Sequence, residues 1–211
     1  MLDVHPPHEK MHGFTDFLLH LLTITIGLLI ALGLEGCVEH WKQRELQKDA
    51  DTKLRQEIRD NAKEIALVHN ANATEQANLV RIVNFMSARK KNQSYDTHQI
   101  RLDFTLGDLK SASWKTAAAT GALGFMEYDQ VQRYSDVYQL QDKYSALQDQ
   151  TIDEFLQLQS YVIYGFDPEK ITPADAGSAE LDARRALVRL TAMDQVGTAL
   201  AKEYDAVLKN N

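Results

Sequence analysis

Hydrophobic and polar residues divide the chain into one apolar run near its N-terminus and several amphipathic segments after it. Residues 17–34 contain no Asp, Glu, Lys or Arg, and 18 mostly apolar residues are about what an α-helix needs to cross the hydrocarbon core of a bilayer. The pattern predicts a single transmembrane helix in a lipid bilayer. We place it at residues 14–36, after an N-terminal tail of residues 1–13 and before a helical stalk and bundle domain of residues 37–211.

Beyond the span, apolar side chains recur at steps of three and four over residues 41–91, which is typical of one long amphipathic helix. Residues 37–106 contain neither glycine nor proline, so we expect nothing to break this helix. Asn61, Asn72 and Glu75 interrupt its apolar face. Polar residues buried between copies of a chain fix register and oligomer state, which makes Asn61 and Asn72 candidates for an oligomer interface. The alternative is that they face water.

The rest of the chain is divided into shorter elements. Residues 99–106 alternate apolar and polar side chains, a pattern of period two that we interpret as an extended connector or a frayed helix start. It leads to a short helix near residues 113–120, which Gly121 is suited to cap. Two amphipathic helices are predicted at residues 128–164 and 178–209. The predicted fold class is therefore all-α, with the transmembrane helix continuing into a long helix that packs in an antiparallel helical bundle.

The predicted helix lengths differ in a way that bears on self-association. At a rise of 1.5 Å per residue the long helix measures roughly 75 Å, whereas the two later helices measure roughly 55 and 48 Å. They are too short to cover it, so an apolar strip next to the membrane is expected to pack against copies of the chain. The buried face of the last helix is expected to hold Leu181, Leu187, Leu190, Val196, Leu200, Tyr204 and Val207.

Composition excludes one class of partner and one kind of crosslink. The chain of 211 residues has a formal net charge of -7, and its longest basic run is only residues 89–91, so a nucleic-acid-binding surface is not expected. Cys37 is the only cysteine. No intrachain disulfide is therefore possible, and packing has to hold the domain together.

One face of the predicted span carries small and polar residues. Asp16, His20, Thr23, Gly27 and Ala31 recur at spacings of three and four, which places them on one side of a helix. Small residues at this spacing let transmembrane helices approach closely, and polar ones prefer a partner helix to lipid. We therefore predict a homo-oligomer with Thr23, Gly27 and Ala31 in its interface. The alternative is a single span alone in lipid.

The N-terminal tail is rich in histidine. His8, His12, Asp16 and His20 share one helix face, and in an oligomer they would form stacked rings able to bind a divalent transition metal or relay protons. A metal is thus the one cofactor that the sequence suggests. The alternative is a solvated tail with histidines at the lipid headgroups. His8 and His12 also fit the H-E-x-x-H pattern of zinc proteases, but no domain precedes them to frame a cleft, and Leu18 stands where the extended motif needs its third histidine.

Residues 34–37, Leu-Glu-Gly-Cys, resemble the lipobox of bacterial lipoproteins, in which Cys37 would be lipidated after cleavage. Glu35 suits that motif poorly, so we favour an intact span over lipidation. Basic residues decide the expected orientation, because they collect in cytoplasmic segments. Five follow the span closely and only Lys10 precedes it, which predicts a cytoplasmic C-terminal domain, with a periplasmic one as the alternative. The five are Lys42, Arg44, Lys48, Lys53 and Arg55.

The stretch PPHEKMHGFTDFLLHLLTITIGLLIALGLEGCVE, residues 6–39, resembles an uncharacterised family of small bacterial single-span membrane proteins, and the helical sequence after it is similar too. The resemblance is specific over about thirty residues. It implies a bacterial inner-membrane protein with an all-helical domain. It brings no activity, cofactor or catalytic residue.

These observations favour a non-enzymatic function. Beyond residue 40 the only histidines are His69 and His98, and there is neither a P-loop nor a dinucleotide-binding glycine motif. We expect a membrane-anchored, self-associating helical scaffold or regulatory subunit that contacts other membrane protein subunits. The alternative is an oligomeric protein that binds metal or conducts protons or ions through its N-terminal His and Asp rings.

Overall fold

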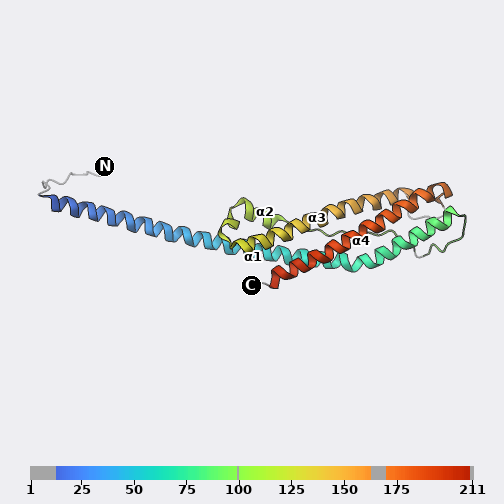
Figure 1. Cartoon of the computed structure of the whole chain (residues 1–211), viewed down its shortest axis with the longest axis horizontal. Coiled ribbons are helices and arrows are strands. Elements are labelled where there is room, and N and C mark those ends of the chain that lie inside the picture. Colours follow the sequence, from blue (N-terminus) through green and yellow to red (C-terminus); the bar gives the residue numbers. More distant parts are fainter. Residues whose placement is uncertain (1–12, 99, 163–169, 210–211) are drawn as a thin grey trace, which may run out of the picture. The chain divides into compact units, whose positions relative to one another are not determined.

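The computed structural model describes residues 13–98, 100–162 and 170–209, and every regular element in them is helical. The all-α prediction is therefore confirmed. The elements are α1 (Phe14–Lys90), α2 (Ala112–Ala119), the 3-10 turn η1 (Ala122–Phe125), α3 (Tyr128–Gln159), the 3-10 turn η2 (Ser160–Val162) and α4 (Pro173–Lys209). They form two compact units, residues 1–48 and residues 49–211, and α1 contributes to both (Figure 1).

The first unit consists of the N-terminal part of α1. Its apolar stretch is completely exposed, and it is the one segment among the described residues that is long and apolar enough to cross a membrane. The prediction that residues 14–36 are helical is confirmed.

A left-handed residue ends α1. Asn92 has a φ of 55°, its N–H donates to the carbonyl of Arg89 at 3.0 Å, and the N–H of Gln93 donates to that of Ala88 at 2.9 Å. This pair of bonds is the Schellman motif, which satisfies the last carbonyls of a helix. Asparagine tolerates the conformation better than most residues, so the helix ends one residue before the predicted position.

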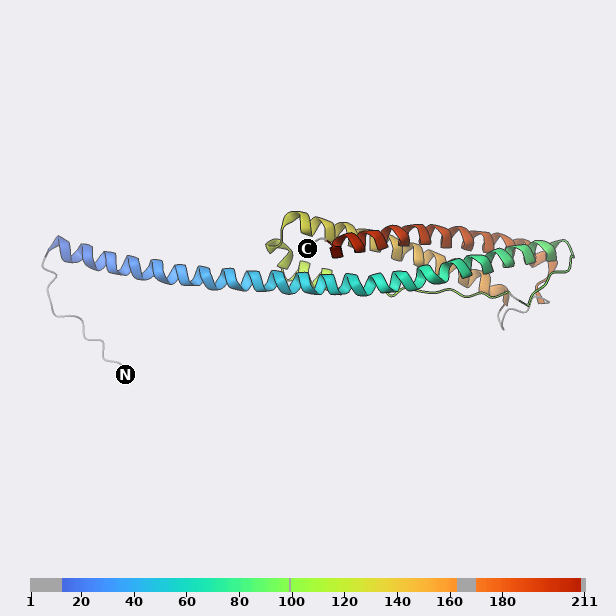
Figure 2. The ribbon, with the colours of Figure 1, turned by 90° about the horizontal axis from the view of Figure 1, so that it is seen from below.

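The second unit is a bundle of three long helices. α3 runs in the same direction as α1, and α4 runs antiparallel to both (Figures 1 and 2). The contacts that show these directions are Asp51–Tyr134 and Asn61–Gln141 between α1 and α3, Arg55–Val207 and His69–Asp194 between α1 and α4, and Gln141–Tyr204 and Gln150–Arg189 between α3 and α4.

Because α1 and α3 are parallel, the chain has to return along the bundle between them. Residues 93–98 and 100–111 make this return without regular structure, which agrees with the extended connector rather than with the frayed helix start that the alternating pattern also allowed. The connector is partly buried: Ile100 is buried, and the ring of Phe104 stacks on Phe155 with a centroid distance of 4.6 Å. At its end α2 forms where a short helix was expected, and Gly121, with a φ of 75°, follows it in the left-handed conformation that favours glycine.

The prediction that α4 begins near residue 178 was wrong, because Pro173 begins the helix instead of breaking it. Proline is suited to the first position of a helix, where no N–H is needed. The hydroxyl of Thr172 caps that first turn by accepting from the N–H of Asp175 at 3.2 Å, and it donates to the Asp175 carboxylate at 2.6 Å. α4 therefore starts at Pro173 and continues through Gly177.

The buried face of α4 also differs from the predicted one. Leu181 is 51% exposed, and Leu187 is only half-buried. Small side chains occupy the core positions of this half of the helix instead: Ala176, Ala179, Ala183 and Ala186, all fully buried. Small residues let helix backbones approach closely, so the packed face here follows side-chain size rather than hydrophobicity. The C-terminal half agrees with the prediction, since Leu200 and Tyr204 are fully buried.

Candidate functional site

The predicted interface residues of the span lie on one exposed helix face. Thr23, Gly27 and Ala31 are exposed, and a Cβ added at Gly27 would meet nothing within 4 Å. The Thr23 hydroxyl donates to the carbonyl of Leu19 at 2.8 Å. Its hydroxyl proton is thus bonded within its own helix. This face is free to receive a second helix.

The predicted metal ligands are only partly described. Asp16 and His20 are exposed on the first turns of α1, whereas His8 and His12 lie outside the described residues. Within the described ranges no group of three His, Cys, Asp or Glu side chains is placed to hold a metal ion. Cys37 is exposed on α1.

Asn61 and Asn72, the other predicted interface residues, are buried inside the bundle, with exposed fractions of 1% and 3%. Asn72 donates from Nδ2 to Asp194 on α4 at 2.7 Å. Asn61 bonds to the connector and to α3. Both amides therefore make contacts within the chain, and in this fold they do not present their side chains to a second copy. The sequence left open whether these two amides are buried or face water, and it did not indicate that they contact Lys110 and Asp194 of their own chain.

Asn61 holds the connector by pairing with a backbone. Its Nδ2 donates to the carbonyl of Lys110 at 2.7 Å, and its Oδ1 accepts from the Lys110 N–H at 2.9 Å. Gln141 on α3 donates to the same carbonyl at 2.9 Å, and its Oε1 accepts from Asn61 at 3.0 Å and from the Tyr204 hydroxyl at 2.7 Å. Three helices and the connector thus meet in one hydrogen-bonded network.

Three further side chains continue this arrangement along the connector and into the first turn of α2. Gln148 on α3 accepts from the N–H of Gly107 at 2.9 Å and donates to its carbonyl at 3.1 Å. Glu75 accepts from the Thr105 N–H and hydroxyl at 2.8 and 2.6 Å, and Glu57 accepts from the Ser113 N–H at 2.8 Å. These side chains satisfy the backbone N–H and C=O groups of the connector, as a neighbouring strand does in a sheet. We call this set the connector clasp: Glu57, Asn61, Glu75, Gln141 and Gln148.

Tyrosines complete the polar interior. The hydroxyl of Tyr138 donates to Glu57 at 2.7 Å, and its ring stacks on Trp114 at 5.2 Å. Burial, and then the bond to Glu57, raise the pKa of Tyr138 far above its ordinary value. Burial likewise raises the pKa of Tyr204, and it raises that of Tyr144 to about 12. These phenols stay protonated near neutrality, and those of Tyr138 and Tyr204 act as hydrogen-bond donors rather than as bases.

One carboxylate of the clasp is imperfectly satisfied. Both bonds from Thr105 reach Oε1 of Glu75, and its Oε2 is buried without a hydrogen-bond partner, as are Oδ1 of Asn72 and the hydroxyl of Tyr144. Burial is the largest effect on Glu75 and raises its pKa, opposed by the Thr105 bonds and aided by the charge of Asp103. The interior is therefore polar and hydrogen-bonded. It nevertheless disfavours the ionised form of the Glu75 carboxyl group compared with a carboxyl group in water.

A histidine and an aspartate form the one pair in the described bundle that resembles catalytic machinery. Nδ1 of His69 lies 2.8 Å from Oδ1 of Asp194, at a groove of about 350 Å³ between α1 and α4 that Thr198 and Lys202 also line. Among the described contacts no hydroxyl or amine bonds to the other His69 nitrogen, and the same Asp194 oxygen accepts from Asn72. The pair serves as a link between two helices.

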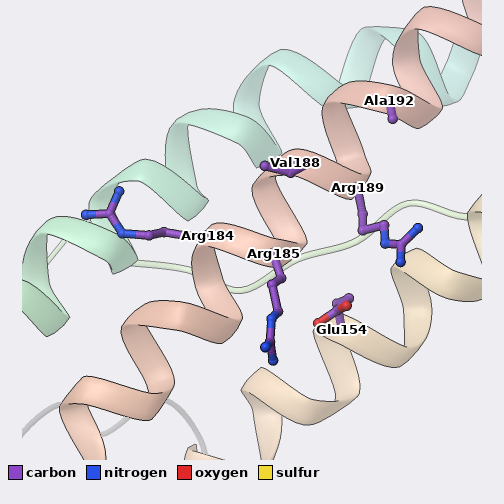
Figure 3. A pocket seen from close by; sticks show the side chains of 6 residues that line it. All are labelled: Glu154, Arg184, Arg185, Val188, Arg189 and Ala192. Atoms are coloured by element: carbon purple, nitrogen blue, oxygen red, sulfur yellow. The ribbon is translucent and has the colours of Figure 1, made fainter.

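A second groove, of about 430 Å³, lies between α3 and α4 and is basic. Arg185 and Arg189 extend from α4 toward α3 on either side of Glu154, whereas Arg184 extends in another direction (Figure 3). Val188, which is 68% exposed, contributes an apolar side chain to the lining. Sequence reasoning missed this groove, because it depends on which part of α3 lies beside which part of α4.

Comparison with known proteins does not extend these findings: no protein family matches the chain, and no curated protein and no solved structure is similar to it.

Proposed function

We propose that this chain is a membrane-anchored, self-associating helical scaffold or regulatory subunit of a membrane assembly, without catalytic activity of its own. The observation that carries the proposal is the complete exposure of the apolar stretch of α1. An exposed apolar surface of this length is unfavourable in water and favourable in lipid. The same helix continues into the bundle, so the bundle is tethered by a continuous helix rather than by a flexible linker.

The interior of the bundle supports a scaffold rather than an enzyme. Its buried polar side chains are engaged in holding the connector against α1 and α3, as Asn61 and Gln148 illustrate. Networks of this kind specify one packing arrangement and rigidify it. A rigid helical bundle on a membrane anchor is suited to position partner subunits.

Self-association through the span is the second part of the proposal. The Thr23, Gly27 and Ala31 face has the small residues that close helix packing in lipid requires. Asp16 and His20 lie on the same face, where a neighbouring span would shield them from lipid. The location is the bacterial inner membrane, with the bundle in the cytoplasm as the basic residues after the span indicate.

Two matched glycines test this proposal. Gly27 lies on the small-residue face, whereas Gly33 lies six residues away on a different side of the helix, and a Cβ at either one would meet nothing in the monomer. We expect the full chain to fractionate with membranes and to resist alkaline extraction. Gly27→Leu should lower the oligomer mass in detergent, measured by native mass spectrometry or light scattering, while Gly33→Leu should leave it unchanged. A protein that is fully extracted by alkali, or an identical mass for all three chains, would overturn the proposal.

A further inference from the structure

Two pairs of like charges lie on neighbouring helices of the bundle. Asp149 and Asp153 are four residues apart on α3, and Arg185 and Arg189 are four residues apart on α4. Like charges at this spacing face one another and destabilise a helix. Each pair is thus locally unfavourable, and opposite charges placed against both pairs would relieve the repulsion.

The two pairs lie at the same height, meaning the same position along the bundle. Nη1 of Arg189 donates to Oε1 of Gln150 at 2.5 Å, and Glu154 lines the α3–α4 groove together with both arginines. Figure 3 shows Arg185 and Arg189 extending from α4 toward α3, with Glu154 between them. Because residues 150 and 154 follow Asp149 and Asp153 directly, the basic pair of α4 is level with the acidic pair of α3.

The carboxylates of the acidic pair are exposed, and no described side chain forms an ion pair or hydrogen bond with Asp149 or Asp153. The basic pair is only partly neutralised. Arg189 bonds to the neutral amide of Gln150, and Arg185, 53% exposed, pairs with Asp182 at 3.2 Å within its own helix. Both sets of charges therefore remain able to bind opposite charges from outside the monomer.

We propose that a second copy of this chain docks on this α3–α4 face and places the acidic pair of each copy against the basic pair of the other. A two-fold axis parallel to the helices keeps each residue at its height, so one rotation forms both contacts at once, as an isologous interface requires. It also keeps the chains parallel, as copies inserted in a membrane in the same way are. Arginine–carboxylate pairs with two parallel bonds give such an interface geometric specificity.

Exposed side chains lie around these charges. Helical periodicity puts Ala146 on the exposed side of α3 beside Asp149 and Asp153, and all three are exposed. Val188 in the groove of α4 is 68% exposed. The contact thus combines apolar surface with charge, as protein interfaces do. The inference rests on the proposed self-association and adds a second contact surface, in the bundle, to the one in the span.

A single introduced cysteine reports this contact directly. In full-length chain carrying Cys37→Ser, Ala146→Cys should form a disulfide between copies on mild oxidation in detergent or membranes. Thr74→Cys, at an exposed position of α1, is the matched control and should form at least about tenfold less. A yield at Ala146 no higher than at Thr74, or a crosslink from Ala146 to a different protein, would overturn the proposal.

Charge reversal tests the pairing itself. Arg185→Glu with Arg189→Glu, or Asp149→Lys with Asp153→Lys, should each lower the Ala146 disulfide yield at least about tenfold, since like charges then meet across the interface. All four changes together should restore the yield. Asp129→Lys with Asp136→Lys, also exposed on α3, makes the same change in net charge as the acidic reversal and should leave the yield unchanged. If the variant with all four substitutions crosslinks no better than the variants with two, the proposed pairing is excluded.

The span and the bundle contact fail separately in these experiments. Gly27→Leu acts on the span alone, so a chain that keeps the Ala146 disulfide but loses oligomer mass would support both surfaces. If charge reversal abolishes the disulfide but Gly27→Leu leaves the oligomer mass unchanged, only the span interface is rejected. Absence of the disulfide in a chain whose mass still depends on Gly27 would reject the bundle contact only.

Discussion

Gly197 lies so close to the ring of Tyr144 that a Cβ added to the glycine would stand 3.1 Å from Cε2 of the tyrosine. Tyr144 is 1% exposed and its ring is enclosed by the bundle, so it has little room to move away. The glycine is therefore required for α3 and α4 to pack as they do at this point.

Gly197→Ala should destabilise the bundle in spite of the higher helix propensity of alanine. Alanine gains about 1 kcal/mol over glycine inside a helix, but overpacking a core costs typically about 1–3 kcal/mol, so we expect a net loss. Gly177→Ala is the control: the same change in the same helix, where the nearest atom to the new Cβ is Lys90 Cδ at 4.0 Å. It should raise the free energy of unfolding measured with urea. A Gly197→Ala chain as stable as Gly177→Ala would show that the ring is free to move.

The paired bonds between Asn61 and Lys110 predict that the connector depends on this amide. Asn61→Ala removes the partner of the Lys110 N–H, and it removes one of two donors to the Lys110 carbonyl and one of two donors to Oε1 of Gln141. Each buried group left unsatisfied costs about 1–3 kcal/mol, so the loss should exceed about 2 kcal/mol in urea unfolding. Asn70→Ala, exposed on the same helix, should change stability by less than about 0.5 kcal/mol. Equal effects of the two substitutions would contradict a clasp role for Asn61.

Much of this fold follows from local patterns, because α1 has no breaker to end it and its apolar spacing persists through Met86, which is fully buried. The extended connector was also indicated by its alternation of apolar and polar residues. The residues that the connector contacts could not be predicted in this way, since Asn61 and Lys110 are 49 residues apart. An amide on a helix seam looks the same in a sequence whether it contacts a second copy or a distant backbone.

The α3–α4 face shows the same limit. The charges of Asp153 and Arg185 are visible in the sequence, but their relative height depends on how α3 and α4 are registered in the bundle. The start of α4 was predictable in principle, since Thr172 followed by Pro173 and Asp175 is a helix-start signal. Gly165 and Pro168 before this signal and Gly177 after it obscured the start.

Glu75 makes the stability of the bundle depend on pH. Burial raises the pKa of its carboxyl group, so the ionised form is disfavoured in the folded state. The stabilisation associated with protonated Glu75 is fully present below the pKa of the unfolded chain and is lost as the pH rises through the raised folded value. Asp103 from the connector adds to this shift, and Tyr144 from α3 faces the same interior.

Glu75→Gln should therefore stabilise the bundle at pH 7 relative to the native chain, because the amide keeps an oxygen for the Thr105 bonds and carries no charge. The advantage should shrink as the pH is lowered toward 4, measured by thermal unfolding at each pH. Glu203→Gln, at an exposed position of α4, should show no such trend. A lower melting temperature for Glu75→Gln at pH 7 would mean that the charge itself holds the connector.

The buried phenols set an upper pH limit for the fold. Burial raises the pKa of Tyr144 to about 12 and raises those of Tyr134, Tyr138 and Tyr204 further. Because these folded values lie above that of an unfolded tyrosine, about 10, their contribution to stability is complete below pH 10 and is lost as the pH rises above it. Ionisation of these four side chains should therefore coincide with loss of helix. Absorbance at 295 nm and far-ultraviolet circular dichroism, recorded in the same titration, measure the two changes.

Tyr138→Phe removes one buried phenol and leaves Glu57 with the Ser113 bond, so it should reduce the absorbance change at the unfolding transition. Ionisation of all tyrosines at pH 11 with the helical signal intact would show that the phenols are accessible in the folded bundle.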